Sequence, residues 1–77
     1  MFKGKTKVSL KLPRFSGNFA EWGNFWGLFQ TLVDERTDIS PVVKFYYLLQ
    51  SLTDEPLHIV KGLPISDLNY QIALSML

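Results

Sequence analysis

The side chains that could perform chemistry are few in this sequence and lie far apart. His58 is the only histidine and there is no cysteine, so the chain lacks both a thiolate and a second imidazole from which to build a metal site. The acidic pairs at 34–35 and 54–55 would point in different directions on a helix, which is typical of helix ends and not of a general acid and base. The glycines form no phosphate-binding loop. We therefore expect no catalytic residue, no metal site, no cofactor and no enzyme.

Basic side chains gather at the N-terminus. The first 14 residues carry five of the eight basic residues and no acid, whereas the remaining 63 carry three basic and seven acidic residues, a net charge of −4. Such an arm can contact nucleic acid, or it can be a soluble edge attracted to an acidic neighbour. The second interpretation is favoured because no arginine cluster or run of stacking aromatic residues accompanies the lysines. The weak nucleic-acid candidates are Lys3, Lys5, Lys7, Lys11 and Arg14.

The end of this arm has the pattern of a β-strand. Val8, Leu10 and Leu12 alternate with polar residues, which predicts a strand over about 7–12 that ends at Pro13. No later segment has a strand pattern, so the backbone groups of this strand need another partner. Either the arm pairs with the same arm of another copy, or it lies extended over the helices of its own chain.

An aromatic helix follows the arm. Residues 12–33 contain both tryptophans and four of the six phenylalanines, and Asn18 is a suitable N-cap for a helix over about 19–35. Its apolar arc covers roughly half the circumference, more than one covered face needs, so we expect a neighbour on two sides. Gly23 and Gly27 lie one turn apart and favour close approach of another backbone.

Three further helices are expected. The first begins at Pro41 after Ser40 and runs to about residue 52. A short helix follows the cap Thr53 and ends at a left-handed Gly62. The last helix follows the cap Ser66. The predicted core comprises Phe15, Trp22, Phe25, Trp26, Phe29, Leu32, Phe45, Leu48, Leu52, Tyr70 and Ala73. The self-association candidates are Val8, Leu10, Leu12, Gly23, Gly27, Leu28, Val43 and an exposed Tyr47.

The fold class predicted from these elements is an all-α bundle of about four helices with a short N-terminal strand or extended arm. We divide the chain into a basic arm, 1–14, and a helical domain, 15–77, whose last helix is still periodic at residue 77 and indicates a piece of a longer protein. No apolar run approaches the ~20 residues of a membrane span, and the N-terminus has no signal-peptide pattern. We expect an intracellular, cytoplasmic chain without membrane contact.

Several motifs together resemble a known family. They are LPRFSG at 12–17 before the two tryptophans, KFYYLLQSL at 44–52, KGLP at 61–64 and NYQIAL at 69–74. This pattern resembles the Gag capsid region of LTR retrotransposons of the Pao/Bel type and is more distantly similar to the Gag of Gypsy-type elements and to the Arc protein. The chain departs from the family at Tyr46, Leu49 and Pro56.

The resemblance implies a non-enzymatic capsid N-terminal lobe that associates with itself into a shell around RNA, with the RNA bound by regions outside this chain. The alternative is a domesticated Gag-like adaptor domain in a host protein, with a groove beside Trp22 and Trp26 that accepts an extended peptide. The expected partners are therefore further copies of the chain, or a peptide ligand.

Overall fold

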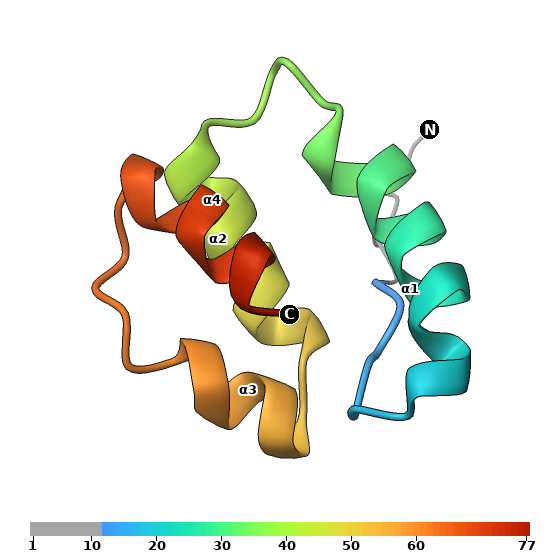
Figure 1. Cartoon of the computed structure of the whole chain (residues 1–77). Helices are drawn as coiled ribbons and strands as arrows, with labels where there is room; N and C mark the ends of the chain where they lie inside the picture. The colour runs from blue at the N-terminus through green and yellow to red at the C-terminus, as the bar shows by residue number, and fades with distance from the viewer. Residues whose placement is uncertain (1–11) are drawn as a thin grey trace, which may run out of the picture.

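The computed structural model describes residues 12–77, which form a small helical bundle (Figure 1). A 3₁₀ turn, Phe19–Glu21, leads into α1, Trp22–Phe29, and α1 continues as a π-helical turn, Gln30–Asp34. The other helices are α2, Pro41–Ser51, α3, Asp54–Val60, and α4, Asp67–Met76. The all-α class is confirmed, and the described residues contain no strand. The strand predicted at 7–12 lies outside the described residues except for Leu12, which has no regular structure.

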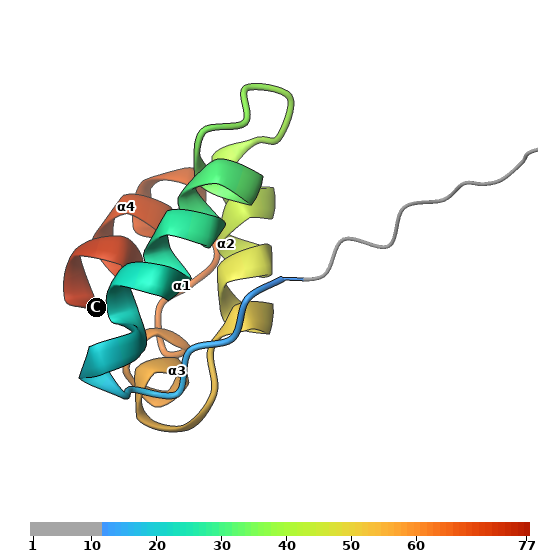
Figure 2. The ribbon, with the colours of Figure 1, turned by 90° about the vertical axis from the view of Figure 1, so that its right-hand side faces the viewer.

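Three of the helices run side by side and the fourth covers one end. α2 and α4 are parallel neighbours, α1 lies against this pair in the opposite direction, and α3 lies across the far end (Figures 1 and 2). The Asp67 carboxylate accepts a hydrogen bond from the backbone N–H of Val42 at 2.9 Å, which joins the N-termini of α2 and α4. At the end of the π-helical turn, the Asp34 carbonyl accepts a hydrogen bond from the Lys44 ammonium of α2 at 2.7 Å.

The helix starts agree with the sequence in part. Asn18 accepts from the N–H of Ala20 at 3.1 Å and Ser66 accepts from Asn69 at 3.1 Å, so both predicted caps are confirmed. The side chains of Ser40 and Thr53 make no capping bond. At α2 the capping role falls to the Asp67 carboxylate, which a local sequence pattern cannot reveal because it lies 25 positions away.

A left-handed glycine occurs before the first helical turn and not after α3. Gly17 has φ +104°, and a Cβ built on it would lie 3.3 Å from Cδ of Pro56. Gly62 has no positive φ, so the prediction of a left-handed stop there is wrong. Instead Lys61 keeps a right-handed conformation and donates to Leu57 at 2.9 Å, and Leu63 donates to Val60 at 3.1 Å, which closes the end of α3 as a tight turn.

The core lies where α1, α2 and α4 meet. Its buried apolar residues are Phe15, Phe25, Phe29, Val33, Phe45, Leu48, Leu52, Val60, Tyr70 and Ala73. Three residues predicted for the core, Trp22, Trp26 and Leu32, are instead half-buried at its edge. They lie on the flanks of the first helical segment, whereas Phe25, Phe29 and Val33 occupy the centre of its inner face.

The segment before α1 finds a backbone partner inside the chain. The N–H of Phe15 donates to Ser51 at 3.0 Å, and Thr53 donates to the carbonyl of Phe15 at 3.0 Å, so Phe15 and Leu52 form an isolated parallel bridge. This bridge lies after the strand predicted over 7–12, so the prediction that this strand finds no partner strand in the chain is not tested by it. Leu52 joins α2 to α3 in an extended conformation, which leaves the backbone groups beside it available.

Candidate functional site

A column of aromatic rings runs along α1. The indoles of Trp22 and Trp26 stack with their ring centres 5.9 Å apart and their planes 7° apart. Phe15 meets Trp22 edge-on at 5.1 Å, and Trp26 continues to Phe29 at 6.1 Å. A spacing of four residues puts the indoles on the same flank of the helix. Because both are only half-buried, part of each ring remains open to a ligand.

Two adjoining cavities lie beside this column. The first has a volume of about 340 Å³ and the second about 370 Å³, and Trp22 lines both. The first is lined chiefly by Phe15, Phe19, Trp22, Pro56, Ile59 and Met76. The second is lined by Trp22, Trp26, Asp34, Gln71, Leu74 and Ser75. We call the two together the aromatic groove, which has α1 as one wall and α3 and α4 as the other.

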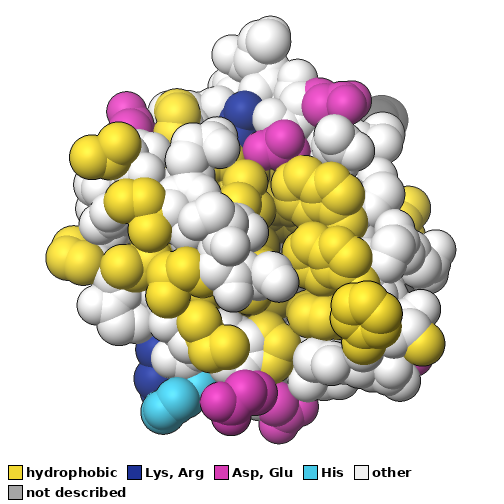
Figure 3. Space-filling view, viewed as in Figure 1, with side chains coloured by type: hydrophobic (Ala, Val, Ile, Leu, Met, Phe, Trp, Pro, Cys, Tyr) yellow, Lys and Arg dark blue, Asp and Glu magenta, His cyan; other side chains and the backbone are white. Residues whose placement is uncertain are grey.

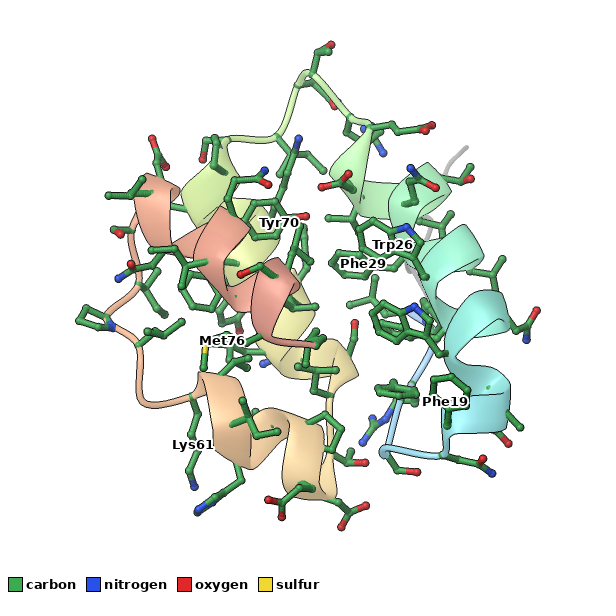
Figure 4. The ribbon with its side chains drawn as sticks, in the orientation of Figure 1. Phe19, Trp26, Phe29, Lys61, Tyr70 and Met76 are labelled. Carbon is green, nitrogen blue, oxygen red and sulfur yellow. The ribbon has the colours of Figure 1, made fainter. Side chains whose placement is uncertain are left out.

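The figures show the shape of this groove. The hydrophobic column of α1 faces α4 across a hollow in the space-filling view (Figure 3). In the stick view Trp26 and Phe29 point from α1 toward α4, and Phe19 lies at the lower end of the column (Figure 4). Phe19 is 89% exposed, the largest exposed fraction among the large hydrophobic residues of the described region. Phe19 belongs to the 3₁₀ turn at the start of the helical segment, and its side chain lines the first cavity.

The ends of the groove are acidic. Glu55 lines the first cavity and Asp34 the second, and no lysine or arginine of the described region lines either. Figure 3 shows acidic side chains above and below the hydrophobic column. An apolar floor between two carboxylates suits an extended ligand that is apolar at its centre and basic toward its ends.

Tyr70 holds one of these carboxylates in place. Its hydroxyl donates to Oδ1 of Asp34 at 2.6 Å. Burial, followed by the hydrogen bond to Asp34 and the negative charge of that residue, raises the pKa of Tyr70 well above its ordinary value. The neutral hydroxyl therefore remains a donor at physiological pH, and it orients the Asp34 carboxylate at the end of the groove.

Other apolar side chains are exposed away from the groove. Leu28 and Val43 are exposed, as their place among the self-association candidates requires. Tyr47 is instead half-buried against the core, and its neighbour Tyr46 is exposed at 52%. The difference arises because Tyr47 lies on a flank of α2 that turns toward the core.

The outer face of α4 was missed by the sequence interpretation. Leu68 is 74% exposed and Ile72 is also exposed, and the stripe ends at Met76, which is exposed and lines the first cavity of the groove. Their spacing of four residues is a second apolar stripe on the helix, opposite the one that contains Tyr70 and Ala73. This periodicity is visible in the sequence, but the sequence interpretation assigned only the inner stripe of the helix, with Tyr70 and Ala73, and not the outer one.

The remaining candidates are placed as follows. Gly23 and Gly27 lie exposed on α1, and a Cβ on either would meet nothing within 4 Å, so no neighbour in the described region requires a glycine there. Leu12 is half-buried against the core, and Val8 and Leu10 lie outside the described residues. Of the weak nucleic-acid candidates, Arg14 is exposed, while Lys3, Lys5, Lys7 and Lys11 lie outside the described residues.

Residues 12–77 contain neither a metal-binding cluster nor a membrane-spanning helix. No three histidine, aspartate or glutamate side chains there come together in a group that could hold a metal ion. None of the helices in this part of the chain has the length and apolar character needed to cross a membrane.

Comparison with known proteins places the chain in a family. No curated protein and no solved structure matches it. The model of a family described as "Protein of unknown function (DUF1759)" matches residues 15–77, which is most of the chain and the whole of the helical domain. The chain therefore belongs to the DUF1759 family, which is associated with retrotransposon Gag-related proteins.

Proposed function

We propose that this chain is a structural self-assembly module, the capsid N-terminal lobe of a Gag protein of the Pao/Bel type, related to Gypsy-type Gag and to Arc. The observation that supports this proposal is the distribution of exposed apolar side chains over several faces. Leu28 lies on α1, Val43 and Tyr46 on α2, and Leu68 and Ile72 on the outer face of α4. A shell needs more than one contact surface, because a single self-complementary patch closes at a dimer.

The proposed module acts without catalysis and without a cofactor. Tyr70 is the group whose pKa departs most strongly from its ordinary value, and its hydroxyl serves as a hydrogen-bond donor between helices. The RNA enclosed by the shell would be bound by other regions of the Gag protein, because the described domain carries more acidic than basic side chains.

Self-assembly can be tested by sedimentation velocity from micromolar to millimolar protein. We expect the weight-average mass to rise with concentration, and Leu68→Glu or Leu28→Glu to reduce the rise because a charge in an apolar contact disfavours burial. Thr31→Glu, at an exposed polar position of the π-helical turn, is the matched control. Protein that stays monomeric up to millimolar concentration would contradict the proposal.

The aromatic groove supports a second candidate function, a domesticated Gag-like adaptor that binds peptides or proteins. Cavities of about 340 and 370 Å³ side by side, lined by half-buried indoles, have the size and lining typical of ligand sites. Titration with extended peptides should change the tryptophan fluorescence of this chain, and Trp22→Phe should diminish the change. If neither the fluorescence nor any heat of binding responds to such peptides, this candidate fails.

A further inference from the structure

The aromatic groove is a surface without an occupant among the described residues, and its chemistry restricts what can fill it. Trp22 and Trp26 line it from the α1 wall, Phe19 and Ile59 line the first cavity, and its two ends carry Glu55 and Asp34. A ligand must therefore offer apolar side chains to the indoles and positive charge to the ends.

We propose that this groove binds the basic N-terminal arm, residues 3–11, of a second copy of the chain. The inference rests on the proposed function of self-assembly and names the segment that makes one of its contacts. The arm reads KGKTKVSLK and so combines four lysines with the apolar residues Val8 and Leu10.

Charge complementarity is the first argument. All four charges of the arm are positive, whereas residues 12–77 carry four basic and seven acidic side chains, a net charge of −3. The carboxylates at both ends of the groove face no lysine or arginine in the cavity linings. Lys44 lies beside Asp34 and donates to its backbone carbonyl. Lysines of the arm would add positive charge at both ends of the groove, and an ammonium group over an exposed indole face adds a cation–π contact.

The length and alternation of the arm are the second argument. At ~3.3 Å per residue an extended strand from Lys5 to Lys11 spans ~20 Å, and the helical segment from Phe19 to Asp34 rises ~22 Å at 1.5 Å per residue. Lysines near the ends of the arm would therefore come close to the acidic ends of the groove. Val8 and Leu10 project to the same side of such a strand and would meet the indoles between them.

The position of Leu12 favours a second copy over the chain's own arm. Leu12 is half-buried against the core. Segment 12–15 enters the bundle on the α2 side of α1, whereas α4, which forms a wall of the groove, lies on the other side of α1 (Figure 2). The chain's own arm therefore joins the bundle at the α2 side of α1, although Phe15 at the end of the segment lines the first cavity. The arm of another copy can approach the open side between α1 and α4 directly.

The test is an intermolecular paramagnetic relaxation experiment on the full chain. Because the chain has no cysteine, Ser9→Cys accepts a nitroxide at one position only. The nitroxide-labelled Ser9→Cys chain, at natural isotope abundance, is mixed with ¹⁵N-labelled wild-type chain that carries no nitroxide. The total concentration is one at which sedimentation shows dimers. We expect the nitroxide to broaden the indole N–H signals of Trp22 and Trp26 more strongly than the amide of Ile65, which lies in the loop between α3 and α4.

A nitroxide on Thr37→Cys, in the exposed loop before α2, is the control and should leave the indole signals sharp. Dimers in which the Ser9 label broadens no indole signal would overturn the inference and leave the proposed self-assembly standing. In a second sample, ¹⁵N-labelled Ser9→Cys chain that carries the nitroxide is diluted into unlabelled wild-type chain, so that only broadening within one chain is detected. Indole signals that are broadened in this sample and not in the first would mean that the arm fills the groove of its own chain, which would also overturn the inference. Chain that remains monomeric at millimolar concentration would contradict both.

Charge reversal provides an independent measurement. Glu55→Lys and the double variant Lys5→Glu/Lys11→Glu should each weaken the dimer, by roughly threefold to tenfold, because each replaces attraction across the groove by repulsion. Mixing the two variants should restore association between them. Asp38→Lys, which changes an exposed loop charge outside the groove, is the matched control. Variants that associate as tightly as wild type would count against the arm as the occupant.

Discussion

The Tyr70 hydroxyl donates to the Asp34 carboxylate at 2.6 Å and so joins α4 to the end of the first helical segment across 36 positions of the sequence. The backbone carbonyl of the same Asp34 accepts from the Lys44 ammonium of α2 at 2.7 Å. One residue at the end of the π-helical turn thus connects three helices, and it also lines the aromatic groove. The stability of the bundle and the shape of the groove are linked through this residue.

Removing the Tyr70 hydroxyl tests this link. Tyr70→Phe should lower the free energy of unfolding by ~1 to 2 kcal/mol, because a hydrogen bond to a charged acceptor is lost and the ring remains. Tyr46→Phe, which removes an exposed hydroxyl, is the control and should change stability by less than ~0.5 kcal/mol. Urea unfolding at pH 7 measures both, and equal effects would contradict the role given to the Tyr70–Asp34 bond.

The pH dependence of stability follows from the raised pKa of Tyr70. A raised folded-state pKa means that the stabilisation is fully present below the unfolded value of ~10 and is lost as the pH rises through the folded-state pKa. Above pH ~10, wild type should lose up to ~1.4 kcal/mol per pH unit that Tyr70→Phe does not lose. Urea unfolding at pH 8 and pH 11 should therefore show the two proteins converging. A constant difference between them would mean that Tyr70 ionises normally in the folded chain.

Gly17 and Gly23 offer a matched pair of alanine substitutions. Gly17→Ala should destabilise the chain by ~1 to 3 kcal/mol, because φ is +104° there and the new Cβ would lie 3.3 Å from Pro56. Gly23→Ala should stabilise it by ~0.5 to 1 kcal/mol, since the position is helical and open. Thermal unfolding at micromolar protein measures both. If both substitutions shifted the melting temperature in the same direction, the positive φ of Gly17 would not be what makes alanine unfavourable there.

Lys44 should matter more than an ordinary surface lysine. Lys44→Ala removes an ammonium group that donates to the last turn of the first helical segment, where a positive charge is also favourable to the helix dipole, and we expect a cost of ~1 kcal/mol. Lys61→Ala, at an exposed turn, should cost less than ~0.5 kcal/mol. Chemical unfolding of the two variants distinguishes them. A cost at Lys44 no larger than at Lys61 would show that its bond to Asp34 is not populated in solution.

Phe29 and Trp26 separate the core from the groove. Phe29 is fully buried, so Phe29→Ala should cost ~3 to 5 kcal/mol and can unfold the domain. Trp26 is half-buried, so Trp26→Ala should cost less and should alter the groove in a chain that remains folded. Far-ultraviolet circular dichroism with urea unfolding makes the comparison. A larger loss at Trp26 would place the indole, and not the phenyl ring, at the centre of the core.

The sequence was sufficient for the helices and much of the core. The caps Asn18 and Ser66 and the proline at the start of α2 depend on residues within a few positions of each helix end, so local patterns locate them. The core residues Phe25, Phe29 and Phe45 are identified for the same reason, because helical periodicity determines which side chains share a face. The all-α class follows from these local signals alone.

The tertiary structure decided which surfaces remain open and which distant residues meet. Asp67 at the start of α2, Pro56 against Gly17, and Ser51 and Thr53 around Phe15 are contacts between segments far apart in sequence, and no local pattern specifies them. The half-buried state of Trp22 and Trp26 has the same origin, because the width of the space between α1 and α4 depends on how three helices pack. Periodicity determines the direction in which a side chain points from its helix, and only packing determines whether a neighbour is there to cover it.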